Sequence, residues 1–231
     1  RVIVWADDTA RAHGHIAVRG GPLGGDGGFV ETSGKRYLEA TRTPDVSASR
    51  GKWGQWVLDP STITFDNLPG QSNMTGGDPL RPNDGSVTSR MNIGLLQMLV
   101  NPGGTATVDT TAEANDGPGG GGAGDIIFNV LADFTPAAAA VLNLRADRNI
   151  NLTQGLRKAG PGTLEVNFVP NQIGTAPAAV ASISTGITSN GGLTLNGAVN
   201  IMGASLFAPT DPGALLESFA VKAGATATLV T

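Results

Sequence analysis

Glu31 and Asp59 are the acidic residues whose surroundings most suggest catalysis. Glu31 lies in Phe-Val-Glu-Thr-Ser-Gly, and Asp59 stands directly before Pro60. As a pair, they could serve as general acid and general base. Alternatively, Glu31 accepts backbone N–H groups of a neighbouring turn and Asp59 caps one. Ser33 is no better as a nucleophile, because it is not in a G-x-S-x-G elbow. No other catalytic type accompanies them, so we predict structural roles and no catalytic residue.

Metal binding has two sequence candidates. His13 and His15 are the only histidines, and at i and i+2 of a strand both imidazoles would share one face. No carboxylate or third histidine is nearby in the sequence, so we predict an exposed turn pair. Asp7-Asp8 and Asp26 could bind Ca²⁺, but residues of this type also make turns. The Gly-Gly-Asp-Gly-Gly run occurs once, whereas calcium-binding nonapeptide repeats come in tandem copies. We therefore predict no metal and no cofactor, with Ca²⁺ as the open alternative.

Aromatic residues concentrate in the first quarter of the chain. If they are exposed, they form a platform on which sugars stack. If they are buried, they fill the wide first turns of the fold. We predict burial for Trp56 and leave Trp53 open; the other members of the group are Trp5, Phe29 and Tyr37. The glycine run at 117–124 lacks the Lys-Ser/Thr of a phosphate loop and is interpreted as a flexible connector.

The composition predicts many short strands. The chain of 231 residues has 34 glycines and 14 prolines, yet 40% of it is hydrophobic, which argues against disorder. A net charge of −4 gives no basic footprint for nucleic acid or anionic membrane. Without cysteine, disulfides and thiolate chemistry are excluded. No apolar run is long enough to span a bilayer, so we predict no membrane insertion.

The chain divides into three predicted parts. Residues 1–66 form a first block of strands, 67–104 a loop followed by a helix, and 105–231 a second series of strands. The helix is predicted over 89–100, because Met91, Leu95 and Leu99 recur at helical spacing before Pro102-Gly103. The predicted strands cover 2–5, 15–18, 28–32, 37–40, 45–48, 56–65, 105–111, 125–130, 141–146, 149–152, 162–168, 181–184, 192–196 and 199–201.

These short strands fit the turns of a solenoid better than hairpins. Leu142 and Leu164 are 22 residues apart, and Leu164 and Ile183 are 19 apart. A variable period of about twenty is typical of a β-solenoid. Alternating L-x-L patterns place aliphatic residues inside and Asn or Thr outside. Stacked asparagines are expected to form a side-chain ladder along the outside.

The chain resembles the filamentous haemagglutinin family, the large exoproteins of two-partner secretion. The block at 24–34 is similar to the family's G-G-x-G-G-F-V-E-T-S-G, and G-Q-W-V-L-D-P-S-T-I-T at 54–64 is a second match. The residues of these two matches that carry the resemblance are Gly25, Gly28, Phe29, Glu31, Ser33, Gly34, Trp56, Asp59 and Pro60. The resemblance implies a right-handed parallel β-helix, secreted through a partner barrel in the outer membrane and used as a surface fibre or adhesin.

The predicted function is therefore a structural, non-enzymatic shaft segment of a secreted protein on the bacterial cell surface. Both ends of the chain have the pattern of bare strands, so we expect molecules to associate end to end into filaments, unless the chain is a piece of a longer solenoid. One alternative is an adhesin that binds a cell-surface or matrix polysaccharide through exposed aromatics and asparagines. Another is a polysaccharide-degrading β-helix enzyme.

Overall fold

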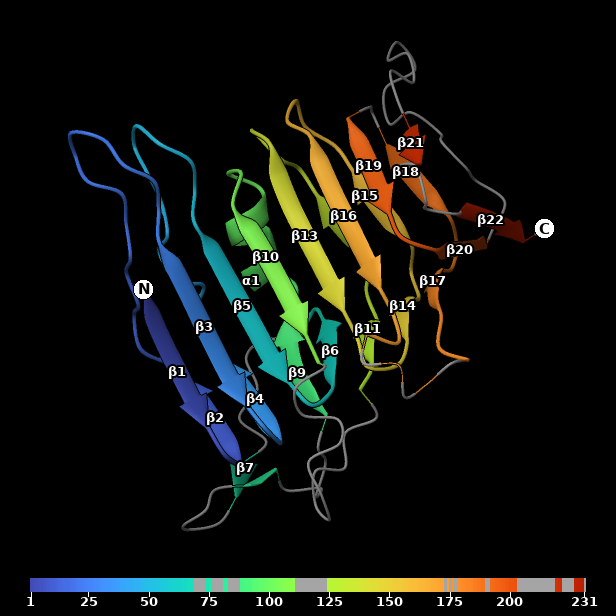
Figure 1. Ribbon diagram of the computed structural model, residues 1–231, viewed down its shortest axis with the longest axis horizontal. Coiled ribbons are helices and arrows are strands. Elements are labelled where there is room, and N and C mark those ends of the chain that lie inside the picture. Colours follow the sequence, from blue (N-terminus) through green and yellow to red (C-terminus); the bar gives the residue numbers. More distant parts are fainter. Residues whose placement is uncertain are drawn as a thin grey trace.

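The structure is a computed structural model that describes residues 1–68, 74–75, 81–82, 88–110, 124–172, 174, 176, 178–189, 192–202, 219–221 and 227–230. It confirms the predicted fold class, a right-handed parallel β-helix with one short helix (Figure 1). Residues 117–123 of the connector predicted over 117–124, and most of the loop predicted after residue 67, lie outside the described residues.

Three parallel sheets form the faces of the solenoid. The eight-stranded sheet runs in chain order from one end of the molecule to the other (Figure 1). Its strands are β1 (Val2–Ala6), β3 (Phe29–Gly34), β5 (Gln55–Pro60), β10 (Thr105–Asp109), β13 (Ala140–Arg145), β16 (Leu164–Val169), β19 (Leu193–Asn196) and β21 (Phe219–Val221).

The second face contains the seven-stranded sheet, in the order β22, β20, β17, β14, β11, β6, β9. Its bounds are β6 (Ile63–Asp66), β9 (Ser89–Asn92), β11 (Ile126–Phe128), β14 (Ile150–Leu152), β17 (Ala181–Ile183), β20 (Val199–Met202) and β22 (Ala227–Val230). The pair β2 (Thr9–Ala12) and β4 (Tyr37–Ala40) extends this face, since β4 contacts β9.

The third face is a three-stranded sheet of β12 (Ala132–Phe134), β15 (Leu156–Lys158) and β18 (Ile187–Ser189). The sequence analysis did not predict these strands. In the first turns this face is made by 16–20 and 45–47, which overlap the predicted strands 15–18 and 45–48; they are joined by backbone hydrogen bonds and one isolated bridge between Ala17 and Asp45. A short antiparallel pair, β7 (Met74–Thr75) and β8 (Arg81–Pro82), stands apart from the faces.

The register corrects the predicted period of about twenty. Leu142 pairs with Val166, and Leu164 pairs with Ala140 and Leu193, so the leucines used to set the period are not stacked on one another. One turn is 24 residues where the solenoid is most regular, as between Asn143 and Asn167. It lengthens to 29 residues between Asn167 and Asn196 because the connecting loop is longer.

Inward-facing aliphatic and aromatic side chains stack into one continuous core. Leu142, Val166 and Leu195 follow one another in register, and all are buried. Phe65 and Phe128 stack with ring centroids 4.6 Å apart. Each turn therefore buries its apolar side chains against its neighbours, which drives the stacking.

The predicted asparagine ladder runs along the outside of the eight-stranded sheet. Asn143 Nδ2 donates to Thr107 Oγ1 (3.0 Å), and Asn167 Nδ2 donates to Asn143 Oδ1 (2.8 Å). Asn196 Nδ2 continues the series to Asn167 Oδ1 (2.5 Å). The outward position opposite the core leucines thus joins four consecutive turns.

The short helical insert is present, but its first predicted turn is a strand. Residues 89–92 form β9, in which Ser89 and Met91 face inward, and α1 (Gly94–Val100) follows. The helix takes the place of a strand in the third face. On one side Leu95 O accepts from Thr43 Oγ1 (2.7 Å), and on the other Gln97 Nε2 donates to Asp133 O of β12 (2.7 Å). The helix therefore covers the edge of the three-stranded sheet.

Candidate functional site

The glycine-rich block at 24–34 forms a corner between the third face and the eight-stranded sheet. Asp26 Oδ1 accepts the Lys52 N–H of the next turn (2.8 Å), so Asp26 fastens this corner as its predicted turn role implies. A Cβ at Gly27 would lie 1.8 Å from Val46 O, and one at Gly54 would lie 2.0 Å from Gly28 O. Backbone packs directly on backbone here, which only glycine allows.

The other glycines of the block serve the same corner or its strand. Gly25 has a φ of 102°. Added Cβ atoms would lie 2.3 Å from Val18 Cγ1 at Gly28 and 2.2 Å from Tyr37 O at Gly34.

The strand residues of the block line the outside of the eight-stranded sheet. Phe29, Glu31 and Ser33 point outward from β3, and Asp59 lies opposite Ser33 on β5. Ser33 Oγ donates to Asp59 O (3.2 Å) and Asp59 Oδ2 (3.3 Å), which ties the two strands together. Within the described residues, Glu31 accepts no backbone N–H, unlike the structural role expected for it. Trp56 and Pro60 face inward; Trp56 is fully buried, as predicted, and its Nε1 donates to Thr32 Oγ1 (3.1 Å).

Both histidines are exposed, as predicted, but they face different neighbours. His13 Nε2 lies 3.1 Å from Glu39 Oε1, and the same buried carboxylate accepts from Arg11 Nε (2.8 Å). This carboxylate is far away in sequence, which is why the sequence did not reveal it. His15 instead lines a groove beside α1. Across the described part of the chain, no three histidine, aspartate or glutamate side chains gather in a way that could hold a metal ion.

Oppositely charged side chains join consecutive turns. Asp7 and Asp8 pair with Lys35 (3.9 Å) and Arg36 (3.8 Å) one turn on, and Asp109 pairs with Arg145 (3.3 Å). Arg157 and Asp133 form a close pair in the third face, which raises the pKa of Arg157 through the hydrogen bond with Asp133. These acidic side chains therefore link consecutive turns of the solenoid through ion pairs.

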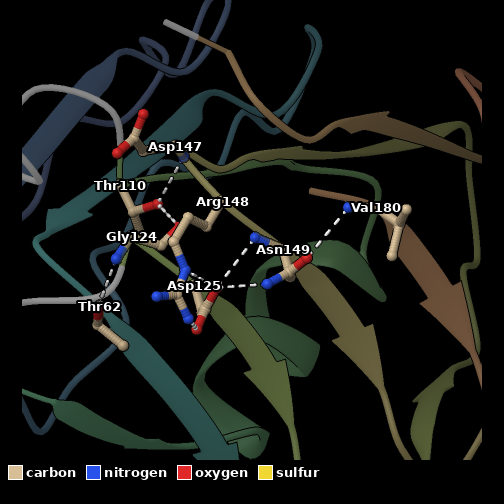
Figure 2. Close-up of polar contacts among 8 residues, drawn as sticks. All are labelled: Thr62, Thr110, Gly124, Asp125, Asp147, Arg148, Asn149 and Val180. Carbon is tan, nitrogen blue, oxygen red and sulfur yellow. Dashed lines mark hydrogen bonds and ion pairs between the residues drawn. The ribbon is translucent and has the colours of Figure 1, made fainter. Parts of the chain in front are cut away.

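A polar network missed by the sequence analysis occupies the corner that precedes the seven-stranded sheet (Figure 2). Asp125 accepts the Asn149 backbone N–H (2.9 Å) through Oδ1 and Arg148 Nη2 (2.7 Å) through Oδ2. One turn away on either side, Thr62 Oγ1 accepts the Gly124 N–H (2.9 Å) and Asn149 Oδ1 accepts the Val180 N–H (3.0 Å). In three successive turns, a side-chain oxygen at this corner thus accepts a backbone N–H of the next turn.

The sequence held one signal for this network. A polar residue precedes the first isoleucine of three stacked strands, namely Thr62 before Ile63, Asp125 before Ile126 and Asn149 before Ile150.

The first strand leaves an apolar pair on the outside of the eight-stranded sheet. Trp5 is 50% exposed and Ile3 is 48% exposed. Lys35 Nζ lies 5.8 Å from the centroid of the Trp5 ring, a cation–π contact. The asparagine ladder lies further along the same outer face. This face therefore carries an exposed aromatic and ordered amides, the two features expected of a sugar-binding sheet.

A groove follows α1 where the helix interrupts the third face. Two adjoining hollows of about 640 and 380 Å³ share Thr41, Leu95 and Met98. The smaller one also has Trp53, half-buried against the core, and Asp45. The Ser47 hydroxyl, which donates to Asp45 Oδ1 (2.6 Å), lowers the pKa of the Asp45 carboxyl.

Lys158 is a buried cation in the third face. It faces inward from β15, in register with Phe134 and Ser189, and is 2% exposed. Its Nζ donates to Gly160 O (3.0 Å). Burial lowers the pKa of its ammonium group, because the charged form is poorly solvated there.

No helix in the described part of the chain has the length and apolar character needed to cross a membrane. A comparison of the chain with known protein families finds no family that matches, and no curated protein matches it either.

Proposed function

We propose that this chain is a structural shaft segment of a secreted bacterial exoprotein and that it has no catalytic role. The observation that carries the proposal is the continuity of the stack. The core, the asparagine ladder and the cross-turn ion pairs each join consecutive turns in register. Such contacts give a solenoid stability along its axis and make its length the property that can vary.

The edges of the stack supply the means of extension. In the described part of the chain, β1 pairs only with β3, and β21 and β22 each pair with one strand, at the opposite end (Figure 1). An exposed strand edge presents backbone groups ready to pair with another strand. A preceding or following turn of a longer polypeptide, or a second copy of this chain, fits these edges. We propose self-association end to end as the route for the isolated chain.

The cellular setting of the proposal rests on the resemblance of the 24–34 and 54–64 motifs. The parent protein would pass a partner transporter in the outer membrane and act at the bacterial cell surface. No nucleic-acid partner, membrane insertion or cofactor belongs to this proposal.

Sedimentation velocity over a concentration series tests the assembly. The chain is expected to shift to larger species as its concentration rises. Ile3→Lys places a charge on the exposed face of the edge strand and should reduce this shift, since lysines protect natural sheet edges. Leu23→Lys is the control, because Leu23 is 88% exposed in a loop. A single species at every concentration, or equal loss in both variants, would contradict end-to-end association.

A second candidate function is carbohydrate binding by an adhesin. The exposed Trp5 and the amides on the eight-stranded sheet favour it, because aromatic faces stack on sugar rings while amides bond hydroxyls. A glycan array probed with the purified chain tests this candidate. Binding of defined glycans supports it, and an array without signal contradicts it.

A further inference from the structure

The groove beside α1 has the size of a small-molecule site. Its two hollows, of about 640 and 380 Å³, lie side by side along the helix and share three lining residues. Ligand pockets of proteins commonly span roughly 300–1,000 Å³. The groove exists because a helix, instead of a strand, fills the third face between 41–47 and β12. It is therefore a consequence of the one interruption in the described stack.

The floor of the groove is apolar. Leu95 and Met98 of α1 line both hollows, and Met98 is 65% exposed. Trp53 adds an aromatic wall, and its position is fixed because it packs against the core. The C–H faces of sugar rings pack on surfaces of this kind.

Two side-chain amides of the groove are each held by one hydrogen bond, and each keeps one polar atom that is not bonded to a described residue. Gln97 Nε2 donates to Asp133 O (2.7 Å), so Gln97 Oε1 remains as an acceptor. Asn101 Oδ1 accepts the Thr135 N–H (2.8 Å), so Asn101 Nδ2 remains as a donor. Neither remaining atom has a partner in the described part of the chain. Groups fixed before binding lose little freedom on binding, which favours affinity.

The charges of the groove leave one arginine available. Arg90 is bound by Asp66 (2.5 Å), and Asp45 is bound by Ser47 and Arg19. Arg42, an exposed lining residue, makes no hydrogen bond or ion pair with any described residue. A guanidinium binds a carboxylate through two parallel hydrogen bonds.

We propose that this groove binds a uronate-containing oligosaccharide, with sugar rings on Trp53 and Met98 and a carboxylate on Arg42. The proposal rests on the second proposed function, carbohydrate binding, and gives it a site and a ligand class. It places that site on the α1 side, away from Trp5. Binding alone is proposed, without cleavage of the sugar.

Isothermal titration of the purified chain with tetragalacturonate, and with the neutral galactose tetramer, tests the proposal. Binding of the uronate should weaken about tenfold in Arg42→Gln, since a charge-assisted bidentate contact is lost. Met98→Glu should have a larger effect and abolish binding, because the introduced carboxylate repels the uronate from the floor of the groove; Met98 is 65% exposed, so the change should leave the fold intact. Arg50→Gln, which removes an exposed charge outside the groove, and Trp5→Ala should leave binding unchanged.

The outcomes separate this site from the broader function. An absence of uronate binding would contradict the proposal that the groove is the binding site. An equal loss of affinity in Arg42→Gln and Arg50→Gln would contradict it as well. Loss of binding in Trp5→Ala but not in Arg42→Gln overturns the groove as well, yet keeps carbohydrate binding and moves it to the sheet face. None of these results bears on the proposed function as a shaft segment, which is tested by the assembly experiment.

Discussion

The turns before α1 and the turns after it build the same solenoid with different contacts. Glycines pack closely on neighbouring backbone in both parts, as at Gly27 and Gly54 before the helix and at Gly162 and Gly197 after it. After the helix, corners and faces are held in addition by side-chain ladders such as the Asp125 network and the stacked asparagines. Among the described residues, a complete third sheet occurs only in the second part, where one turn spans 24 residues between Asp133 and Arg157.

The side-chain ladders indicate which part of the solenoid can vary in its number of turns. Ladders repeat from turn to turn, so the second part can lengthen by adding similar turns. Close-packed glycines recur over a shorter stretch: Gly28, Gly54 and Gly104 directly precede the paired strand residues Phe29, Gln55 and Thr105. The exposed Trp5 and the groove beside α1 both belong to the first, irregular part, so both candidate sugar-binding surfaces lie there.

The largest effect is expected at a backbone-packed corner. Gly27→Ala would force a methyl group against Val46 O, and overpacking of this kind costs about 3 kcal/mol of unfolding free energy. Gly14→Ala is the control, because nothing lies within 4 Å of its added Cβ. Denaturant unfolding measures both. Equal stability of the two variants would show that the corner is not closely packed.

Removal of the Asp125 carboxylate tests the ladders of the second part. Asp125→Ala leaves the Asn149 N–H and Arg148 without their acceptor, and we expect a loss of about 2 kcal/mol. Asp133→Ala breaks a more exposed pair with Arg157 and should cost about 0.5 kcal/mol. Thermal unfolding compares them; equal losses would mean that the corner network is no stronger than a surface pair.

A smaller effect is expected in the asparagine ladder. Asn167→Ala removes the middle amide of the series and should cost about 1 kcal/mol, a typical net value for a protein hydrogen bond. Thr194→Ala, on a neighbouring outward position of β19, serves as the control. If urea unfolding finds Asn167→Ala as stable as the control, the ladder contributes no stability.

Lys158 should make stability depend on alkaline pH. Its folded pKa is lower than the value of 10.5 in the unfolded chain, so between the two values the unfolded state binds more protons. Stability contributed by this group therefore rises as pH increases through that window. Lys158→Met should remove the rise. Urea midpoints measured across the alkaline range check this, and an unchanged slope in Lys158→Met would assign the rise to other groups.

The sequence predicted the fold because aliphatic alternation and short strands are visible without knowledge of the register. It did not predict the third sheet, in which β15 places the charged Lys158 inward and so lacks the alternation of aliphatic and polar residues seen in the other faces. Met91 was assigned to the helix because it lies four residues before Leu95, a helical spacing. In the structure Met91 instead faces inward from β9, and the sequence alone does not distinguish the two. The predicted burial of Trp56 is correct.

The candidate surfaces were less predictable than the fold. Glu39 beside His13, and Arg148 beside Asp125, meet across one turn, and the predicted period of about twenty placed the turns out of register. The groove depends on the place of α1 in the third face, which no local pattern determines. The turn role of Asp26 was predictable, because its glycine neighbours already indicated a corner.

The central claim is that both edges of this stack accept further turns. Electron microscopy of the purified chain at high concentration, combined with diffraction from aligned assemblies, tests it most directly. The account predicts rods as wide as one solenoid, with a repeat of about 4.8 Å along the rod axis, the spacing of hydrogen-bonded strands. Particles of single-chain length at every concentration, or rods whose strand repeat lies across the axis, would contradict it.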